Sequence, residues 1–224
     1  TDHGGDEGHP EIEEEIDEVQ LAWSRQKVHE VIDQEAAVLG GDYARVAIGG
    51  RSQGCCTALD AALTHPMLLA GVFASFGHVY SATTAHEYPE GRHALRIRAF
   101  HGAGDQCIAA SLALRTYADL ADLGFDDMSV HVEPKLTHCE PSEVCNQAES
   151  VAFAGALKAW GLLAGTEVHG GQDGQCGRAK GRRLRSGRSE AGHQQRRLRS
   201  SQPSVAIVRG VEPAEAMHME AEVA

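Results

Sequence analysis

Apolar residues recur at regular spacings along roughly the first 160 residues of the chain and lose this order afterwards. Over residues 11–39 they fall three or four positions apart, which is the period of an amphipathic helix, and two glycines follow where a helix commonly ends. We expect this helix to bury two apolar rows, the first being Ile12, Ile16, Val19 and Trp23, and the second Val28, Ile32, Ala36 and Leu39.

Short apolar runs, typical of buried strands, alternate with helical segments over residues 11–163. This alternation predicts an α/β fold in which helices cover both faces of a mostly parallel sheet. The runs predict strands at 45–49, 70–76, 95–100 and 128–132, and the helical spacings predict helices at 55–65, 108–123 and 144–163.

The last quarter of the chain shows no comparable period. Residues 165–202 are mostly Gly, Arg, Ser and Gln, and such a composition buries too little apolar surface to fold alone. We therefore expect an acidic N-terminal tail over residues 1–10, a partial α/β domain over 11–164, and a disordered Arg- and Gly-rich tail over 165–224.

The net charge of −12 conceals two opposite blocks: residues 1–20 hold nine acidic side chains, whereas residues 178–199 hold nine Lys or Arg and the single Glu190. The basic block could bind a nucleic acid or an anionic membrane through charge. It has neither aromatic residues to stack on bases nor amphipathic order, so we expect a solvated tail and no specific nucleic-acid partner. Binding of anions through this tail is the weakest interpretation that we keep.

The six cysteines match neither a small disulfide scaffold nor a C-x-x-C metal site. No apolar run approaches the roughly 18 residues of a membrane span, and no basic-then-apolar leader opens the chain. These features predict a cytoplasmic protein without a transmembrane segment, a metal or an organic cofactor.

The strongest chemical signal is the G-x-S-x-G sequence of residues 50–54, which places Ser52 between a predicted strand and a predicted helix. A sharp turn in this position needs very small neighbours and lifts the serine hydroxyl above the sheet. It also points the hydroxyl at the positively polarised N-terminus of the helix. We therefore predict that Ser52 is a nucleophile.

A nucleophilic serine needs a histidine base, and the histidine needs an acid that fixes its tautomer. Asp105 and His138 follow the predicted strands at 95–100 and 128–132, in the chain order Ser, Asp, His. This order and these positions are those of α/β-hydrolases, so we predict a triad of Ser52, Asp105 and His138. We expect His101 to support the loop around Asp105.

These segments together resemble the phospholipase/carboxylesterase family, which includes acyl-protein thioesterases. The resemblance covers roughly residues 10–163 and rests on residues 45–54, the His101-Gly102 step before Asp105, and the loop ending in His138. It implies an α/β-hydrolase fold and hydrolysis of carboxylic esters or acyl thioesters through an acyl-serine intermediate. The substrate would be a lipid, a small ester or an acylated protein, and the backbone N–H of Gln53 would be one oxyanion donor.

The chain departs from this family at Arg51, where an aromatic or aliphatic residue is common, and at Gln106-Cys107, where proline and valine are usual. The family also places further strands, and the loop with the second oxyanion donor, before the serine. We expect the chain to lack these N-terminal strands, to be weakened as a hydrolase, and to associate with itself through an open sheet edge. The alternative is a truncated, non-catalytic relative that acts as a binding or interaction protein.

Other candidate residues receive structural interpretations. Ser75 ends a predicted strand without flanking glycines, and Cys139 adjoins His138 in sequence, so neither is favoured as a nucleophile. Asp60 and Asp119 lie on predicted helices, where we expect them to be solvated. The remaining histidines lack metal-ligand spacing, and we expect surface or packing roles for His65, His78, His86, His93 and His131.

Overall fold

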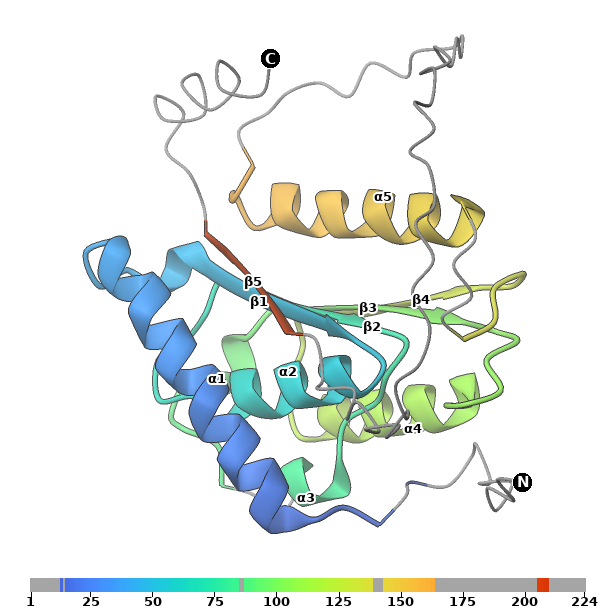
Figure 1. Ribbon diagram of the computed structural model, residues 1–224, viewed down its shortest axis with the longest axis horizontal. Coiled ribbons are helices and arrows are strands. Elements are labelled where there is room, and N and C mark those ends of the chain that lie inside the picture. Colours follow the sequence, from blue (N-terminus) through green and yellow to red (C-terminus); the bar gives the residue numbers. More distant parts are fainter. Residues whose placement is uncertain (1–12, 14, 85–86, 139–142, 164–204, 210–224) are drawn as a thin grey trace, which may run out of the picture. The chain divides into compact units, whose positions relative to one another are not determined.

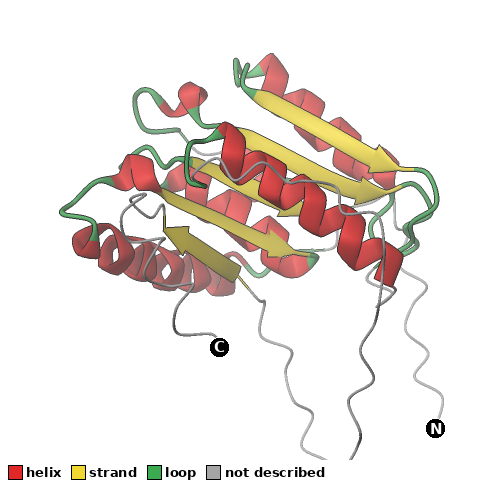
Figure 2. Ribbon diagram, turned by 90° about the horizontal axis from the view of Figure 1, so that it is seen from above, coloured by secondary structure: helices red, strands yellow, loops and turns green. Residues whose placement is uncertain are grey.

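A five-stranded sheet forms the centre of the fold in this computed structural model, which describes residues 13, 15–84, 87–138, 143–163 and 205–209. The strand order is β4-β3-β2-β1-β5, and the strands lie side by side in Figure 2. Neighbours among the first four strands pair in parallel, whereas β5 is antiparallel to β1. The strands are β1 (Val46–Arg51), β2 (Gly71–Ser75), β3 (Ile97–Gly102), β4 (Met128–Glu133) and β5 (Val205–Arg209).

Helices cover both faces of this sheet, which confirms the predicted α/β-hydrolase-type fold (Figure 1). The helix α5 lies on one face, and α1, α2 and α4 lie on the other. No helix in the described ranges is long and apolar enough to cross a membrane. The helices are α1 (Glu18–Val38), α2 (Gln53–Thr64), α3 (Ser81–Thr84), α4 (Ala110–Asp122) and α5 (Glu143–Ala159), with single 3-10 turns at Tyr43–Arg45 and Arg92–Ala94.

The alternation of side chains along each strand divides the core into two clusters. Val46 and Ile48 of β1 pack in the cluster under α1, α2 and α4, whereas Ala47 packs on the α5 side. The α5 cluster also contains Phe73, Phe100 and Trp160. Because both faces are covered, the central strands β1 and β2 are buried along most of their length, which explains why they appear as short apolar runs in the sequence. The edge strand β4 alternates instead between exposed and partly buried residues.

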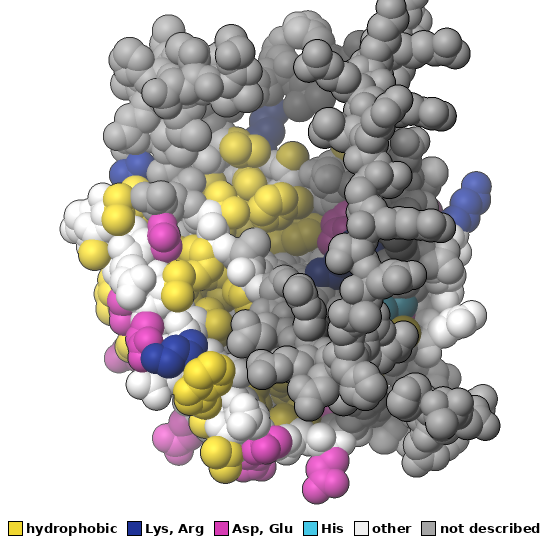
Figure 3. Space-filling view, viewed as in Figure 1, with side chains coloured by type: hydrophobic (Ala, Val, Ile, Leu, Met, Phe, Trp, Pro, Cys, Tyr) yellow, Lys and Arg dark blue, Asp and Glu magenta, His cyan; other side chains and the backbone are white. Residues whose placement is uncertain are grey.

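The first apolar row predicted for the N-terminal helix is wrong. Val19 and Trp23 of α1 are exposed, and Figure 3 shows hydrophobic side chains at the surface in this region. The buried stripe consists instead of Leu21 and the correctly predicted Ile32 and Ala36, with the partly buried Arg25 beside them. Arg25 lies beside this stripe because its guanidinium forms two hydrogen bonds, of 2.8 and 2.7 Å, with a buried carboxylate on α2.

That carboxylate belongs to Asp60, which we expected to be solvated. Its side chain is fully buried, and besides the guanidinium of Arg25 it accepts a hydrogen bond of 2.6 Å from the Thr83 hydroxyl. A buried carboxylate is tolerated only when it is paired and hydrogen-bonded in this way. The pair therefore fastens α1 to α2, the helix that follows Ser52.

The expected open edge of the sheet is also wrong in this structure. Residues 205–209 form β5, which pairs with β1 along its length, from Val46 opposite Arg209 to Gly50 opposite Val205. Val205 and Ile207 pack against one core cluster and Val208 against the other. The premise for self-association through this edge is therefore lost, and residues 165–224 are not disordered throughout. Residues 164–204 and 210–224, like the acidic tail at 1–10, lie outside the described residues.

Candidate active site

Ser52 lies at the turn between β1 and α2 in a strained backbone conformation. Its φ of 55° and ψ of −129° fall in a region that L-residues rarely adopt. The turn also explains the preceding glycine, because a Cβ added at Gly50 would overlap the backbone of Gly54. Strain of this kind persists only where surrounding structure enforces it, and here the N–H of Ser52 donates to the Ser75 carbonyl on β2, at 2.9 Å.

The structure brings the three predicted triad residues together. Ser52 Oγ lies 2.8 Å from His138 Nε2, and His138 Nδ1 lies 2.7 Å from Asp105 Oδ2. The three residues follow β1, β3 and β4, so they meet at the carboxyl edge of the parallel sheet, where α/β folds place their sites. This pattern assigns the Nδ1 proton to the bond with Asp105 and leaves the lone pair of Nε2 for the serine hydroxyl.

Asp105 is held as a carboxylate by its hydrogen bonds. Its side chain is fully buried, which by itself would raise its pKa. The hydrogen bond to His138 and the N–H groups of Ile108 and Cys107, both 2.9 Å from Oδ1, outweigh burial and lower the pKa below its ordinary value. Asp105 is therefore ionised and can balance a positive charge on His138.

His101 supports the same loop, as predicted. Its Nε2 lies 2.9 Å from the Ile108 carbonyl and 3.3 Å from Asp105 Oδ2. Burial lowers the pKa of His101, and the nearby carboxylate of Asp105 only partly opposes this effect. Because a neutral His101 does not compensate the negative charge of Asp105, that charge acts on His138 instead.

Phe76 packs against several residues of the site and was not identified from the sequence. Its ring is fully buried and makes an edge-on contact with His138, with ring centres 6.1 Å apart. It also contacts the rings of Phe100 and His101, and the guanidinium of Arg51 lies 4.8 Å from its centre. Its φ of 52° is positive, like that of Ser52, which is uncommon for a residue other than glycine. An aromatic residue in a buried run gives no sequence signal for this role.

The hydroxyl of Ser75 is buried and donates to Glu149 on α5. Glu149 also forms an ion pair of 3.3 Å with Arg51, the residue before the predicted nucleophile. Ser75 is thus committed to a structural hydrogen bond and does not contact the base. The sequence marked Arg51 as unusual, but its partner lies 98 positions further on (149 − 51) and could not be found by spacing.

Gln53 begins α2 immediately after the serine. The first N–H groups of a helix have no acceptor within the helix and lie at its positive end. The Gln53 N–H therefore lies at the positive end of α2, directly after Ser52. Side chains able to hold a metal also meet at this site, because Asp105, Cys107 and His138 each offer a ligand atom, all within 4.8 Å of one another. Cys139 lies outside the described residues.

Comparison with known proteins agrees with this architecture. The model of the phospholipase/carboxylesterase family matches residues 8–167. Acyl-protein thioesterase 1 of Schizosaccharomyces pombe is 42% identical over 73 residues, which are 33% of this chain and 31% of the yeast protein. The chain therefore matches less than a third of the length of that relative.

Solved structures share the fold over a larger part of the chain. The crystal structure of Arabidopsis thaliana SOBER1 is similar with a TM-score of 0.53 and 26% identity, over 62% of this chain and 66% of SOBER1. The Bacillus cereus carboxylesterase is similar with a TM-score of 0.50 and 15% identity, over 64% of this chain and 65% of the esterase. At that identity the second likeness concerns the fold alone.

Proposed function

The chain belongs to the phospholipase/carboxylesterase family, and from this premise we propose that it hydrolyses carboxylic esters or acyl thioesters with Ser52 as the nucleophile. The observation that carries the proposal is the continuous hydrogen-bonded chain of Ser52, His138 and Asp105, with links of 2.8 and 2.7 Å. Distances of this size are those at which a base can take a proton from a nucleophile.

The reaction would proceed in two halves. Ser52 Oγ attacks the acyl carbon while His138 Nε2 takes its proton, and the same proton then goes to the departing alkoxide or thiolate. The product of this half is an acyl-serine ester. Water then attacks that ester with His138 again as the base, which releases the acid and restores the Ser52 hydroxyl. Asp105 stays ionised throughout and stabilises the imidazolium at each stage.

The negative charge on the tetrahedral intermediates would be stabilised by the Gln53 N–H. A backbone donor at a helix N-terminus is already oriented before the reaction, so it costs no reorganisation when charge develops. One donor of this type typically contributes about 10²- to 10³-fold in kcat. The strained turn at Ser52 would serve the same purpose, because it joins the nucleophile directly to the first residue of α2.

The range of substrates is proposed from relatives. Membership of the phospholipase/carboxylesterase family and similarity to a yeast acyl-protein thioesterase support oxygen esters and thioesters as the two classes to examine. Both have the same reacting acyl carbon and differ in the leaving group, which the imidazolium of His138 protonates in either case.

A fluorophosphonate probe tests the proposal, because it reacts only with an activated serine. We expect the folded chain to be labelled at Ser52, Ser52→Ala to abolish labelling, and Ser75→Ala to retain it as the matched control. Peptide mapping by mass spectrometry identifies the modified residue. Labelling that persists in Ser52→Ala would refute the assignment. A folded parent chain that is never labelled would instead favour the non-catalytic binding protein.

A further inference from the structure

Cys107 places a thiol beside the His138–Asp105 pair. It is an exposed free cysteine, and ligand atoms of Asp105, Cys107 and His138 lie within 4.8 Å of one another. The turn after β3 produces this arrangement, because the N–H of Cys107 donates to Asp105 Oδ1 at 2.9 Å and holds the two residues together. The proposed reaction uses the backbone of Cys107 but has no use for its thiol.

The three side chains form a ligand set of a particular kind. A thiolate, an imidazole and a carboxylate are the groups that bind Zn²⁺, whereas Mg²⁺ and Ca²⁺ prefer oxygen ligands alone. The thiolate and the carboxylate together carry two negative charges, so a complex with a divalent cation is neutral. Neutrality matters here because Asp105 is buried, and a buried unbalanced charge is costly.

The geometry needs only a small adjustment. Zinc bonds of about 2.0 to 2.3 Å put neighbouring ligand atoms roughly 3.3 to 3.8 Å apart in a tetrahedral site. The exposed side chain of Cys107 can rotate to close the remaining gap. Asp105 Oδ1 accepts from two N–H groups, so the ion would take Oδ2, and the 2.7 Å hydrogen bond between Oδ2 and His138 Nδ1 would be exchanged for bonds to the metal. The exposed side supplies a position for water as the fourth ligand.

We propose that Asp105, Cys107 and His138 form a binding site for a thiophilic divalent cation such as Zn²⁺, and that occupation of this site blocks hydrolysis. On binding, the thiol of Cys107 loses its proton to solvent and its sulfur bonds the ion. The ion also takes an imidazole lone pair of His138, so the ring can no longer accept the proton of Ser52. The binding site stands independently of the proposed function, whereas the inhibition rests on it.

Cobalt(II) tests the binding site without any measurement of activity, since a thiolate bound to Co²⁺ gives a charge-transfer absorption band. We expect the reduced full chain to develop this band on titration with Co²⁺. In Cys107→Ser and His138→Ala the band should lose the intensity that corresponds to one bound Co²⁺ per chain. His131→Ala, which changes an exposed histidine, should keep the full intensity. The apparent Kd should rise at least about tenfold in Cys107→Ser, because loss of a group one shell further out already costs about 10- to 100-fold in metal affinity. Identical titrations of the parent and Cys107→Ser would overturn the site.

Ester hydrolysis tests the inhibition. Each variant is compared with its own metal-free rate, and we expect Zn²⁺ to inhibit the parent and Cys107→His but to require at least about tenfold more metal in Cys107→Ser. Mg²⁺ at the same concentrations should inhibit none of them. Equal inhibition of the parent and Cys107→Ser by Zn²⁺ would refute regulation through this site. A parent chain without hydrolysis would count against the proposed function, and the cobalt titration would still decide the metal site.

Discussion

Two of the histidine–aspartate pairs in the described part of the chain, His138–Asp105 and His65–Asp33, differ in which partner is buried. In the proposed active site the Asp105 side chain is fully buried and that of His138 is 11% exposed, with 2.7 Å between Oδ2 and Nδ1. In the second pair the His65 side chain is fully buried and that of Asp33 is 57% exposed, with 3.3 Å between Oδ1 and Nε2. Only the first arrangement leaves the histidine accessible to a substrate.

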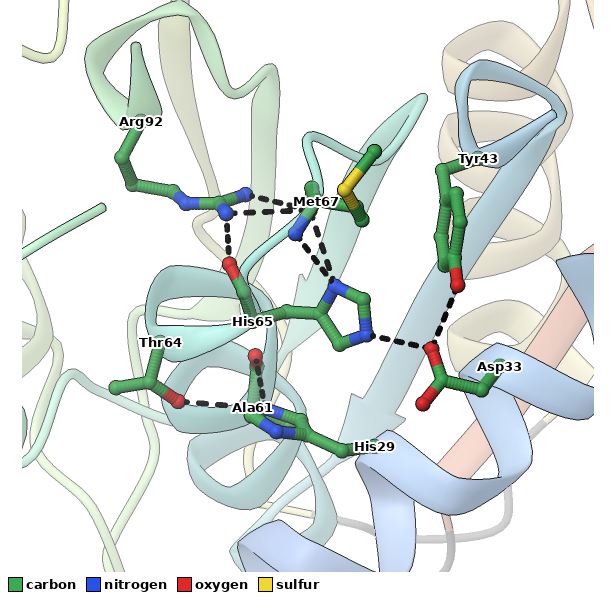
Figure 4. A network of polar contacts seen from close by, with 8 residues as sticks. All are labelled: His29, Asp33, Tyr43, Ala61, Thr64, His65, Met67 and Arg92. Atoms are coloured by element: carbon green, nitrogen blue, oxygen red, sulfur yellow. Dashed lines mark hydrogen bonds and ion pairs between the residues drawn. The ribbon is translucent and has the colours of Figure 1, made fainter. Parts of the chain in front are cut away.

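The two rings also direct their lone pairs differently. Figure 4 shows His65 between the end of α2 and Asp33 on α1, where Nδ1 accepts the N–H of Met67 at 3.0 Å and Nε2 donates to the carboxylate. Its lone pair is therefore used by the backbone. In His138 the aspartate holds the other nitrogen, and the lone pair of Nε2 points at the Ser52 hydroxyl.

The same two chemical groups can thus fasten helices together or form a base, depending on burial and tautomer. The network around His65 joins α1 to the end of α2, helped by Tyr43 on Asp33 and by the buried Arg92, which donates to the His65 and Met67 carbonyls. We expect changes there to lower stability and changes in the triad to lower the rate.

Replacement of His138 should have the largest effect. Loss of the base leaves Ser52 without a proton acceptor, and His138→Ala should lower kcat by on the order of 10⁶-fold, as in other serine hydrolases. Stopped assays with a p-nitrophenyl ester and circular dichroism would measure rate and folding. A variant within tenfold of the parent rate would remove His138 from the mechanism.

Asp105→Asn should lower kcat by about 10⁴-fold, because an amide that donates to Nδ1 forces the wrong tautomer on His138. Asp33→Asn is the matched change in the second pair and should leave kcat within about twofold, since Asp33 lies on α1, away from the triad. Steady-state kinetics of both variants separates the two pairs. Similar losses in both would show that the pairs do not differ in function.

His65→Ala should lower stability and spare the rate. It removes a fully buried ring and leaves the Met67 N–H without its acceptor, which together should cost about 2–4 kcal/mol in the free energy of unfolding. Urea denaturation followed by circular dichroism measures this cost, and kcat per active site is obtained by titration with the fluorophosphonate probe. An unchanged urea midpoint would refute the structural role.

The smallest effect concerns pH. His29 packs edge-on against His65, with ring centres 4.8 Å apart, and burial above all, aided by the positive charge of Arg25, lowers the pKa of His29. Because the folded pKa is depressed, the unfolded chain takes up the proton first as pH falls below about 6.5, so stability falls there.

His29→Gln should remove part of this decline, on the order of a few tenths of a kcal/mol once solvent screening is included. The measurement is the difference in urea midpoint between pH 7.5 and 5.5 for parent and variant. Burial also lowers the pKa of His101, so His101 should account for the rest of the loss of stability at low pH. An identical difference in parent and variant would show that His29 does not contribute.

The sequence by itself determined the four parallel strands, the turn at Ser52 and the order of the three triad residues. These features have local signatures: apolar runs, glycines that a close backbone approach requires, and polar residues just beyond strand ends. A parallel sheet then brings strand ends together, so Asp105 and His138 could be placed near Ser52 before any distance was known.

Only the tertiary structure decided which distant segments pair. β5 pairs with β1 although more than 150 residues separate them. Glu149 contacts Arg51 and Ser75. The buried carboxylate of Asp60 binds Arg25, which is why a polar residue lies beside the buried stripe of α1. An open strand edge or a buried charge indicates only that a partner is needed. The identity of that partner depends on how the chain packs, and the spacing of residues along the sequence carries no record of it.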